Sequence, residues 1–167
     1  MATTETLREE IVGLLPRLRR FARTLTRNPH DADDVVQIAV ERALARADQL
    51  RPDARLSSWL FGIVRNAWID EVRSRGRESR TFAPEELGEN VGDMSLGVNE
   101  DMLAVQDAME RLPDDQRVAV GLVLVEGLSY KEAALIMDVP IGTLTSRLAR
   151  ARETLQSLLA DTTGAVP

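Results

Sequence analysis

Short hydroxyl side chains followed by arginines make residues 141–152 chemically suited to contacting double-stranded DNA. In a helix, which turns about 100° per residue, these polar side chains gather on and beside one face. Small side chains near the start of such a helix let its backbone approach the major groove, and arginine forks one turn later reach guanine edges or phosphates. The alternative is an ordinary amphipathic surface helix. The residues on this face are Thr143, Ser146, Ala149 and Arg150, and the residues that flank it are Thr145, Arg147 and Arg152.

Two helices and a turn must position that face. Ser129 followed by Glu132 is a capping box, which predicts a short helix running to about Met137. A turn over 138–140 follows, and Pro140 suits the first position of the next helix. Apolar residues then recur at spacings of three and four and form one stripe: Ile141, Leu144, Leu148, Ala151 and Leu155. This pattern predicts a helix-turn-helix whose polar face is exposed.

Aromatic residues interleaved with arginines mark a second candidate site, on the helix predicted over 59–77. Such a surface can hold single-stranded nucleic acid by stacking on the rings and by phosphate contact. The alternative is that Trp59 and Trp68 are core residues. Arginines clustered at the end of this helix favour nucleic-acid binding, namely Arg73, Arg75, Arg77 and Arg80.

The helix predicted over 31–48 has two contrasting faces. Its start is acidic, which suits the positive end of the helix dipole. Its inner face is apolar: Ala32, Val35, Val36, Ala39, Ala43 and Ala47. The outer row is either solvated or binds a partner, and the apolar Ile38 in that polar row favours a partner. This outer row is Asp34, Gln37, Ile38, Glu41 and Ala45.

One more amphipathic helix precedes these elements, with Pro16 inside it and a break at 28–30. The only histidine, His30, lies in this break, where capping a helix is a more ordinary role than catalysis. The apolar stripe of the helix is Ile11, Leu14, Leu15, Leu18, Phe21, Ala22 and Leu25.

Composition excludes several functions. The chain has 167 residues and no cysteine, which excludes disulfides, zinc fingers and thiol catalysis. Six aromatic residues, together with abundant Ala, Leu, Arg and Glu, favour helix over sheet. The polar first residues contain no signal-peptide core, and no apolar run approaches a membrane span. We therefore expect a soluble, cytoplasmic, all-α protein without membrane insertion.

The net charge of −6 is unevenly distributed. Residues 1–80 hold 15 basic against 12 acidic side chains, residues 81–115 hold one against ten, and residues 116–167 hold five of each. The acidity is thus concentrated in the middle, and both flanks remain compatible with phosphate contact. Around this middle, residues 77–100 contain Pro84, three glycines and no sustained helical period, which predicts a flexible acidic linker.

Six motifs in order resemble the extracytoplasmic-function group of bacterial sigma factors: DADDVVQ, SSWLFGIVRNAWIDEVR, an acidic linker, LPDDQR, GLSYKEAA and PIGTLTSRLARAR. The resemblance covers about residues 8–159. It implies a protein that binds core RNA polymerase, directs it to promoters and helps to open the DNA, in a stress or environmental response. An anti-sigma factor is an implied further partner, and no cofactor or metal is implied. The implied organisation is a promoter-melting domain (1–80), a linker (81–100), a helix-turn-helix domain (101–160) and a tail (161–167).

The resemblance also assigns roles to residues. Asp34, Gln37 and Glu41 match the face that docks on the polymerase clamp, where family members often carry an acid at the position of Ile38. Five residues, called here the candidate duplex-contacting residues, match the reader of the minus-thirty-five element: Thr143, Thr145, Ser146, Arg147 and Arg150. Thr145 lies at a place where a basic residue is common. The residues that match the part capturing the opened minus-ten strand are Arg55, Ser57, Ser58, Arg65, Asn66, Arg73 and Arg77.

Two other functions compete with this interpretation. A sigma-like decoy would bind an anti-sigma factor without binding DNA. Such a decoy is expected to lose its DNA-facing arginines, whereas Arg147 and Arg150 are present. An enzyme is disfavoured, because no nucleophile–base pairing and no phosphate-cradling glycine loop occurs. The acidic DADD cluster suggests a metal site, but carboxylates at a helix start are ordinary capping chemistry.

Overall fold

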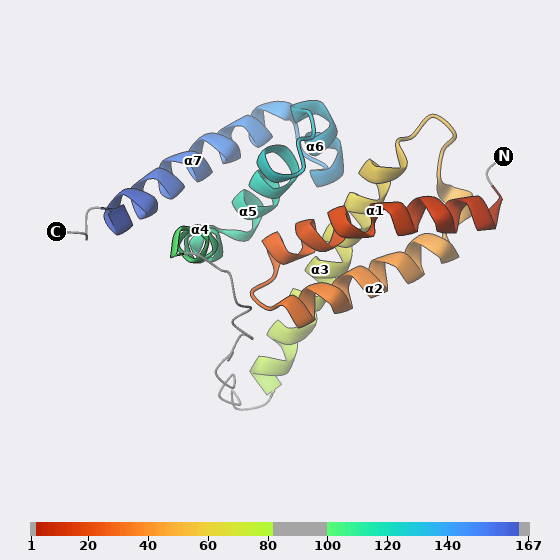
Figure 1. Cartoon of the computed structure of the whole chain (residues 1–167), viewed down its shortest axis with the longest axis horizontal. Coiled ribbons are helices and arrows are strands. Elements are labelled where there is room, and N and C mark those ends of the chain that lie inside the picture. The colour runs from red at the N-terminus through yellow and green to blue at the C-terminus, as the bar shows by residue number, and fades with distance from the viewer. Residues whose placement is uncertain (1–2, 82–99, 164–167) are drawn as a thin grey trace. The chain divides into compact units, whose positions relative to one another are not determined.

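The computed structural model describes residues 3–81 and 100–163. Within these ranges the chain is helical and contains no β-strand, which confirms the predicted all-α class. The chain divides into two compact units, Met1–Asn90 and Val91–Pro167 (Figure 1). The predicted acidic linker falls largely on 82–99, outside the described residues. No helix among the described residues has the length and apolar character needed to cross a membrane.

Over residues 3–81, unit 1 contains three long helices: α1 (Thr4–Leu25), α2 (Pro29–Ala45) and α3 (Leu56–Thr81), with a short 3-10 turn η1 (Ala47–Gln49) between the last two. Each helix packs against the other two. α1 continues through Pro16 without a break, and its N-cap is Thr3. α3 extends to Thr81, beyond the predicted linker start at 77. No proline occurs between residues 53 and 83, and Arg and Glu are good helix formers.

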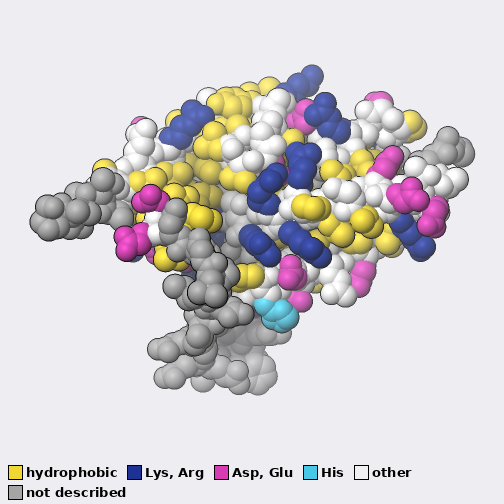
Figure 2. All heavy atoms as spheres, in the orientation of Figure 1, with side chains coloured by type: hydrophobic (Ala, Val, Ile, Leu, Met, Phe, Trp, Pro, Cys, Tyr) yellow, Lys and Arg dark blue, Asp and Glu magenta, His cyan; other side chains and the backbone are white. Residues whose placement is uncertain are grey.

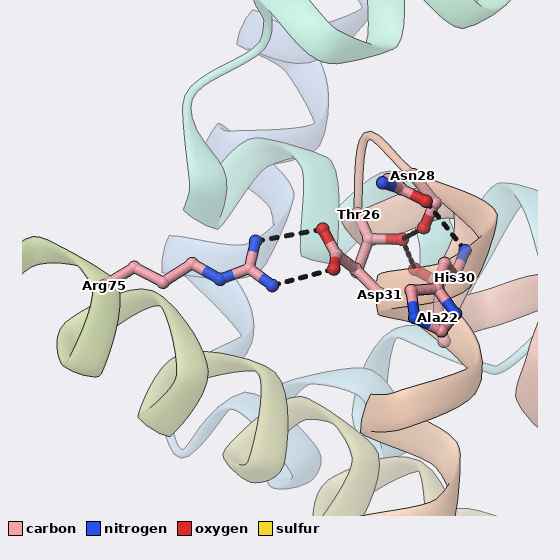
Figure 3. A network of polar contacts seen from close by, with 6 residues as sticks. All are labelled: Ala22, Thr26, Asn28, His30, Asp31 and Arg75. Carbon is pink, nitrogen blue, oxygen red and sulfur yellow. Dashed lines mark hydrogen bonds and ion pairs between the residues drawn. The ribbon is translucent and has the colours of Figure 1, made fainter. Parts of the chain in front are cut away.

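The corner between α1 and α2 differs from the prediction at His30. Asn28 is the N-cap of α2, and its Oδ1 accepts the backbone N–H of His30 at 2.8 Å (Figure 3). Pro29 and His30 therefore belong to the first turn of the helix. The residue that caps the helix is Asn28, and not His30 as predicted. The Thr26 hydroxyl lies within hydrogen-bond distance of two carbonyls, Ala22 O at 3.0 Å and Asn28 O at 3.2 Å. This polar corner fixes where α2 begins.

The core of unit 1 is built from the predicted apolar stripes. Phe21 and Phe61 meet edge to face, with ring centroids 5.3 Å apart. Trp68 is 6% exposed, so it is a core residue, whereas Trp59 is half-buried. The prediction that the inner face of α2 is buried is confirmed for Ala32, Val35, Val36, Ala39 and Ala43. Burial of Trp68 removes one of the two proposed stacking platforms for single-stranded nucleic acid.

Unit 2 contains α4 (Glu100–Arg111), α5 (Asp114–Val120), a π-helical segment η2 (Gly121–Val125), α6 (Tyr130–Met137) and α7 (Ile141–Thr163). α7 packs against α4, α5 and α6. The core side chains include Leu112, Leu122, Leu144, Leu148 and Ala151. Ile141, expected in the apolar stripe of α7, is instead 50% exposed at the first position of that helix.

The helix-turn-helix prediction for α6 and α7 is confirmed. Ser129 caps α6 by accepting the backbone N–H of Glu132 at 3.1 Å. Asp138 then adopts the left-handed conformation, with φ 55°, and Val139 N–H donates to Ala134 O at 3.1 Å, which closes the helix. Pro140 lies just before α7, and its carbonyl accepts the N–H groups of Thr143 and Leu144. The sequence had predicted Pro140 as the first residue of this helix, which instead begins at Ile141.

Candidate nucleic-acid interface

The five candidate duplex-contacting residues all lie on the first three turns of α7. Thr145, Ser146 and Arg150 are exposed, and Thr143 and Arg147 are half-buried. The hydroxyls of Thr145 and Ser146 donate to carbonyls one turn back, at 2.9 and 3.0 Å, so their oxygens retain acceptor capacity toward an outside donor. The packed stripe of Leu144 and Leu148 holds the opposite side of the helix in the core. This geometry presents a small, polar helix face of the kind that enters a groove.

Arg147 has a partner that the sequence did not indicate. Its Nε lies 3.3 Å from Oδ2 of Asp115, in the first turn of α5. The two residues are distant in the sequence, and no local pattern connects them. The ion pair joins the candidate DNA-contacting helix to the LPDDQR motif.

The arginine of the same LPDDQR motif is buried. Arg117 is 6% exposed and lies under the C-terminal end of α4. Its Nε donates to Met109 O at 3.0 Å, its Nη2 donates to Leu112 O at 2.8 Å, and Asp114 Oδ1 lies 3.3 Å from Nη2. Helix C-termini leave carbonyls without intrahelical partners, and the guanidinium satisfies them here. Arg117 thus fixes the α4–α5 corner against which α7 packs.

The outer face of α2 is polar and exposed. Asp34, Gln37 and Glu41 are exposed, and Gln37 Nε2 lies 3.5 Å from Glu41 Oε1. Ile38 is half-buried beside them. The spacing of three and four residues places all three polar side chains on the side opposite the buried Val35, Val36 and Ala39. A partner can reach this row without disturbing the core.

The candidate residues for the opened DNA strand extend from Arg55, just before α3, to Arg77 near the end of that helix. Arg55, Asn66 and Arg73 are exposed, and Ser58 and Arg65 are half-buried, with Arg65 Nη1 3.3 Å from Asn66 Oδ1. Ser57 is buried at 9% exposure, which corrects the expectation that it lies on the contact surface. Its place in the first turn of α3 turns it toward the core. Arg77 lies in the helix, but its side chain is outside the described part.

Basic side chains also gather on α1. Figure 2 shows them over the C-terminal half of this helix, whereas acidic side chains lie near its N-terminal end. The helix carries Glu5, Glu9 and Glu10 early and its arginines mostly later, an order that complements the helix dipole. One of these arginines, Arg17, lies over the Phe61 ring, 5.3 Å from its centroid.

An ion pair between α2 and α3 replaces the capping role expected for the first DADD carboxylate. Asp31 accepts two hydrogen bonds from Arg75, at 2.8 and 2.9 Å (Figure 3). These hydrogen bonds lower the pKa of Asp31, against the opposing effect of its partial burial. Arg75 is therefore paired within the protein, whereas the clustering of arginines had suggested that it contacts nucleic-acid phosphates. The described residues contain no group of three acidic or histidine side chains arranged to hold a metal ion.

We expect Arg75→Met to lower the free energy of unfolding of unit 1 at neutral pH by about 0.5–1 kcal/mol, a modest value because Arg75 is 58% exposed. A lowered folded pKa means that the pair stabilises the protein above the ordinary Asp pKa of about 3.9. This stabilisation is lost as the pH falls through the folded value. The difference from wild type should thus shrink below about pH 4.

Urea unfolding followed by tryptophan fluorescence measures this difference in the free energy of unfolding, because both tryptophans lie in α3. A difference that stays constant over this range would contradict the assignment, and Arg23→Met serves as the control.

Comparison with known proteins gives a consistent result. Residues 11–78 match the Sigma-70 region 2 family, and residues 102–155 match the Sigma-70, region 4 family. The ECF RNA polymerase sigma factor EcfG of Rhodopseudomonas palustris (strain TIE-1) is 39% identical over 95% of this chain and 88% of its own length. SigM of Mycobacterium tuberculosis, also an ECF RNA polymerase sigma factor, is 43% identical over 85% of this chain and 71% of its own length.

Solved structures share the fold. The sigma factor RpoE of Bartonella quintana, in complex with the anti-sigma factor NepR, has a TM-score of 0.78 and 34% identity, over 92% of this chain and 96% of that chain. The anti-anti-sigma factor PhyR of the same organism, complexed with NepR, has a TM-score of 0.59 and 20% identity, and this chain covers 49% of its length. The second likeness concerns the fold alone.

Proposed function

Because this chain belongs to the extracytoplasmic-function group of RNA polymerase sigma factors, we propose that it binds core RNA polymerase and directs promoter-specific transcription initiation. The observation that carries this proposal is the exposure of a separate polar surface on each of three helices. These surfaces lie on α2, α3 and α7, and each is backed by an apolar face in its own unit.

Each surface has its own task in this proposal. Asp34, Gln37 and Glu41 dock on the polymerase clamp. On α3 and at its start, Arg55, Ser58, Arg65, Asn66, Arg73 and Arg77 hold the opened minus-ten strand. On α7, Thr143, Thr145, Ser146, Arg147 and Arg150 read the duplex of the minus-thirty-five element. Arginine forks favour this division, because they recognise both phosphates and guanine edges.

Regulation by an anti-sigma factor is part of the proposal, together with cytoplasmic action in a stress or environmental response. It is supported by the relative RpoE, which was solved in complex with NepR. The decoy alternative requires loss of DNA binding. Exposure of Arg150, and of Asn66 and Arg73 in the other unit, favours a sigma factor over a decoy.

The decisive experiment is transcription in vitro with purified bacterial core polymerase and a library of genomic fragments. Addition of the full chain should produce transcripts from a small, reproducible set of start sites. Folded protein that fails to bind core polymerase at micromolar concentration, with no antagonist present, would contradict the proposal. Core binding without selective initiation would contradict the proposed role in promoter recognition.

The two DNA tasks are separable by mutation. Arg147→Ala or Arg150→Ala should weaken contact with the upstream element about tenfold, since a bidentate base contact contributes about 1–3 kcal/mol. Initiation from a template that is already melted should remain nearly unchanged. Asn66→Ala and Arg73→Ala should instead slow opening on duplex promoters. Footprinting reports the upstream contact and permanganate reactivity reports melting, both in holoenzyme. Identical profiles for Arg147→Ala and Arg73→Ala would refute the division of tasks.

A further inference from the structure

The carboxylate of Asp115 is held at both of its oxygens. Oδ1 accepts the backbone N–H of Gln116 at 2.9 Å, and Oδ2 lies 3.3 Å from Nε of Arg147. The Asp115 side chain is 49% exposed and that of Arg147 is 26% exposed, so the pair lies at the edge of the α5–α7 packing. The Asp115 carboxylate is thus oriented by its own helix before it meets the arginine.

This contact restrains a side chain that is otherwise costly to order. A free arginine samples many rotamers, and DNA binding must pay for the loss of that freedom. Asp115 contacts Nε, and a guanidinium carries further donors on its two terminal nitrogens. The arginine can therefore be held by the protein through one side and still present a fork to DNA.

The same carboxylate has an opposing electrostatic effect. A negative charge beside a DNA-contacting surface repels phosphates and weakens binding to any sequence. If Asp115 acted only through this charge, its removal would strengthen binding to all DNA alike. If it acts by orienting Arg147, its removal would weaken binding to the preferred sequence. The two effects have opposite signs at a promoter, so they can be told apart.

We propose that Asp115 is a positioning residue for promoter recognition, which aims the Arg147 guanidinium at duplex DNA and favours the promoter over unrelated sequence. This inference rests on the proposed function, because it requires that Arg147 contacts DNA. Asp115 itself need not touch the DNA. Its contribution is to the difference in affinity between promoter and non-promoter duplexes, which is the quantity that determines specificity.

The test uses holoenzyme formed with the full chain and two duplex probes of equal length. One probe is a promoter selected by the wild-type holoenzyme from a genomic library, and the other is its scrambled sequence. Asp115→Asn keeps the size of the side chain and an acceptor for the Gln116 N–H but removes the charge. We expect affinity for the promoter to fall about threefold to tenfold and affinity for the scrambled duplex to stay level or rise. Asp115→Glu, which keeps the carboxylate, should recover part of the preference.

Two further variants exclude a structural explanation. Asp114→Asn removes the same charge from the same helical turn, but its partner is the buried Arg117, 3.3 Å away. It should leave the ratio of the two affinities at the wild-type value. In an Arg147→Ala background, Asp115→Asn should no longer lower promoter affinity, because the side chain that it orients is gone.

The outcomes separate this inference from the proposed function. A wild-type holoenzyme that does not prefer its selected promoter overturns the proposed function, and the role of Asp115 falls with it. A wild-type preference that Asp115→Asn leaves unchanged, or a parallel rise in affinity for both probes, overturns only the inference. If Asp115→Asn lowers the preference further in the Arg147→Ala background, the inference is also overturned, since the effect would then not pass through Arg147.

Discussion

Replacing Asp34, Gln37 and Glu41 together by lysine is expected to lower the affinity for core RNA polymerase at least about a hundredfold while the protein remains folded. The three side chains are exposed on one side of α2, and the buried residues of that helix lie on the other. If Asp34 and Glu41 dock on the polymerase, complementarity requires positive charge on the surface that they meet, and lysines at these positions repel it. Such a like-charge contact costs several kcal/mol, and about 1.4 kcal/mol corresponds to a tenfold change in affinity. The Coulombic penalty at the polymerase surface should therefore dominate the result.

Fluorescence anisotropy of the labelled chain, titrated with core polymerase, measures the loss of affinity, and circular dichroism checks the fold. A matched control replaces Glu9, Glu10 and Gly13 of α1 by lysine. It makes the same change in net charge, because each set contains two acids and one neutral residue. The space around Gly13 is open to a new side chain. Equal loss of binding in both triple variants would show a general charge effect, and unfolding of the α2 variant would show that the faces of this helix are wrongly assigned.

Replacing Arg117 by methionine is expected to destabilise unit 2 by about 2–4 kcal/mol. This lies between the cost of unsatisfied buried hydrogen-bonding groups, about 1–3 kcal/mol, and that of a broken buried ion pair, about 3–5 kcal/mol. Methionine keeps much of the apolar stem but donates no hydrogen bond. The carbonyls of Met109 and Leu112 and the carboxylate of Asp114 would all lose the guanidinium. The α4–α5 corner should loosen first, and α7 should lose support with it.

The positions of the aromatic residues make this loss measurable in the intact chain. Both tryptophans belong to α3 in unit 1, so their fluorescence does not report on unit 2 directly. Far-UV circular dichroism reports on the helices of both units. In urea, the variant should lose part of its helical signal early while the tryptophan transition stays near its wild-type midpoint. Arg111→Met is the control, because this arginine is 62% exposed in an i,i+4 pair and should cost only about 0.3–0.5 kcal/mol. A helical signal that matches wild type at every urea concentration would contradict the role of Arg117.

The sequence by itself determined the helices α1, α2, α3, α6 and α7 and the apolar faces of α1, α2 and α7, whereas it predicted no bounds for α4 and α5. Helical periodicity and capping are local properties, so the Ser129–Glu132 capping box and the inner face of α2 could be predicted from neighbouring residues. The helix-turn-helix followed from the same kind of pattern. The polar rows on α2 and α7 were also visible, because a residue type and a spacing suffice to place side chains on one face of a helix.

Only the tertiary structure decided how far each face is covered and which charges meet. Periodicity assigns Ile141 to an apolar stripe, but this residue remains 50% exposed at the start of α7, although Leu144 three positions later is fully buried. Ser57 and Trp68 are buried because other helices pack over them. The Asp31–Arg75 and Asp115–Arg147 pairs join residues far apart along the chain. Such contacts depend on the packing of whole helices, which brings together side chains that no local sequence pattern relates.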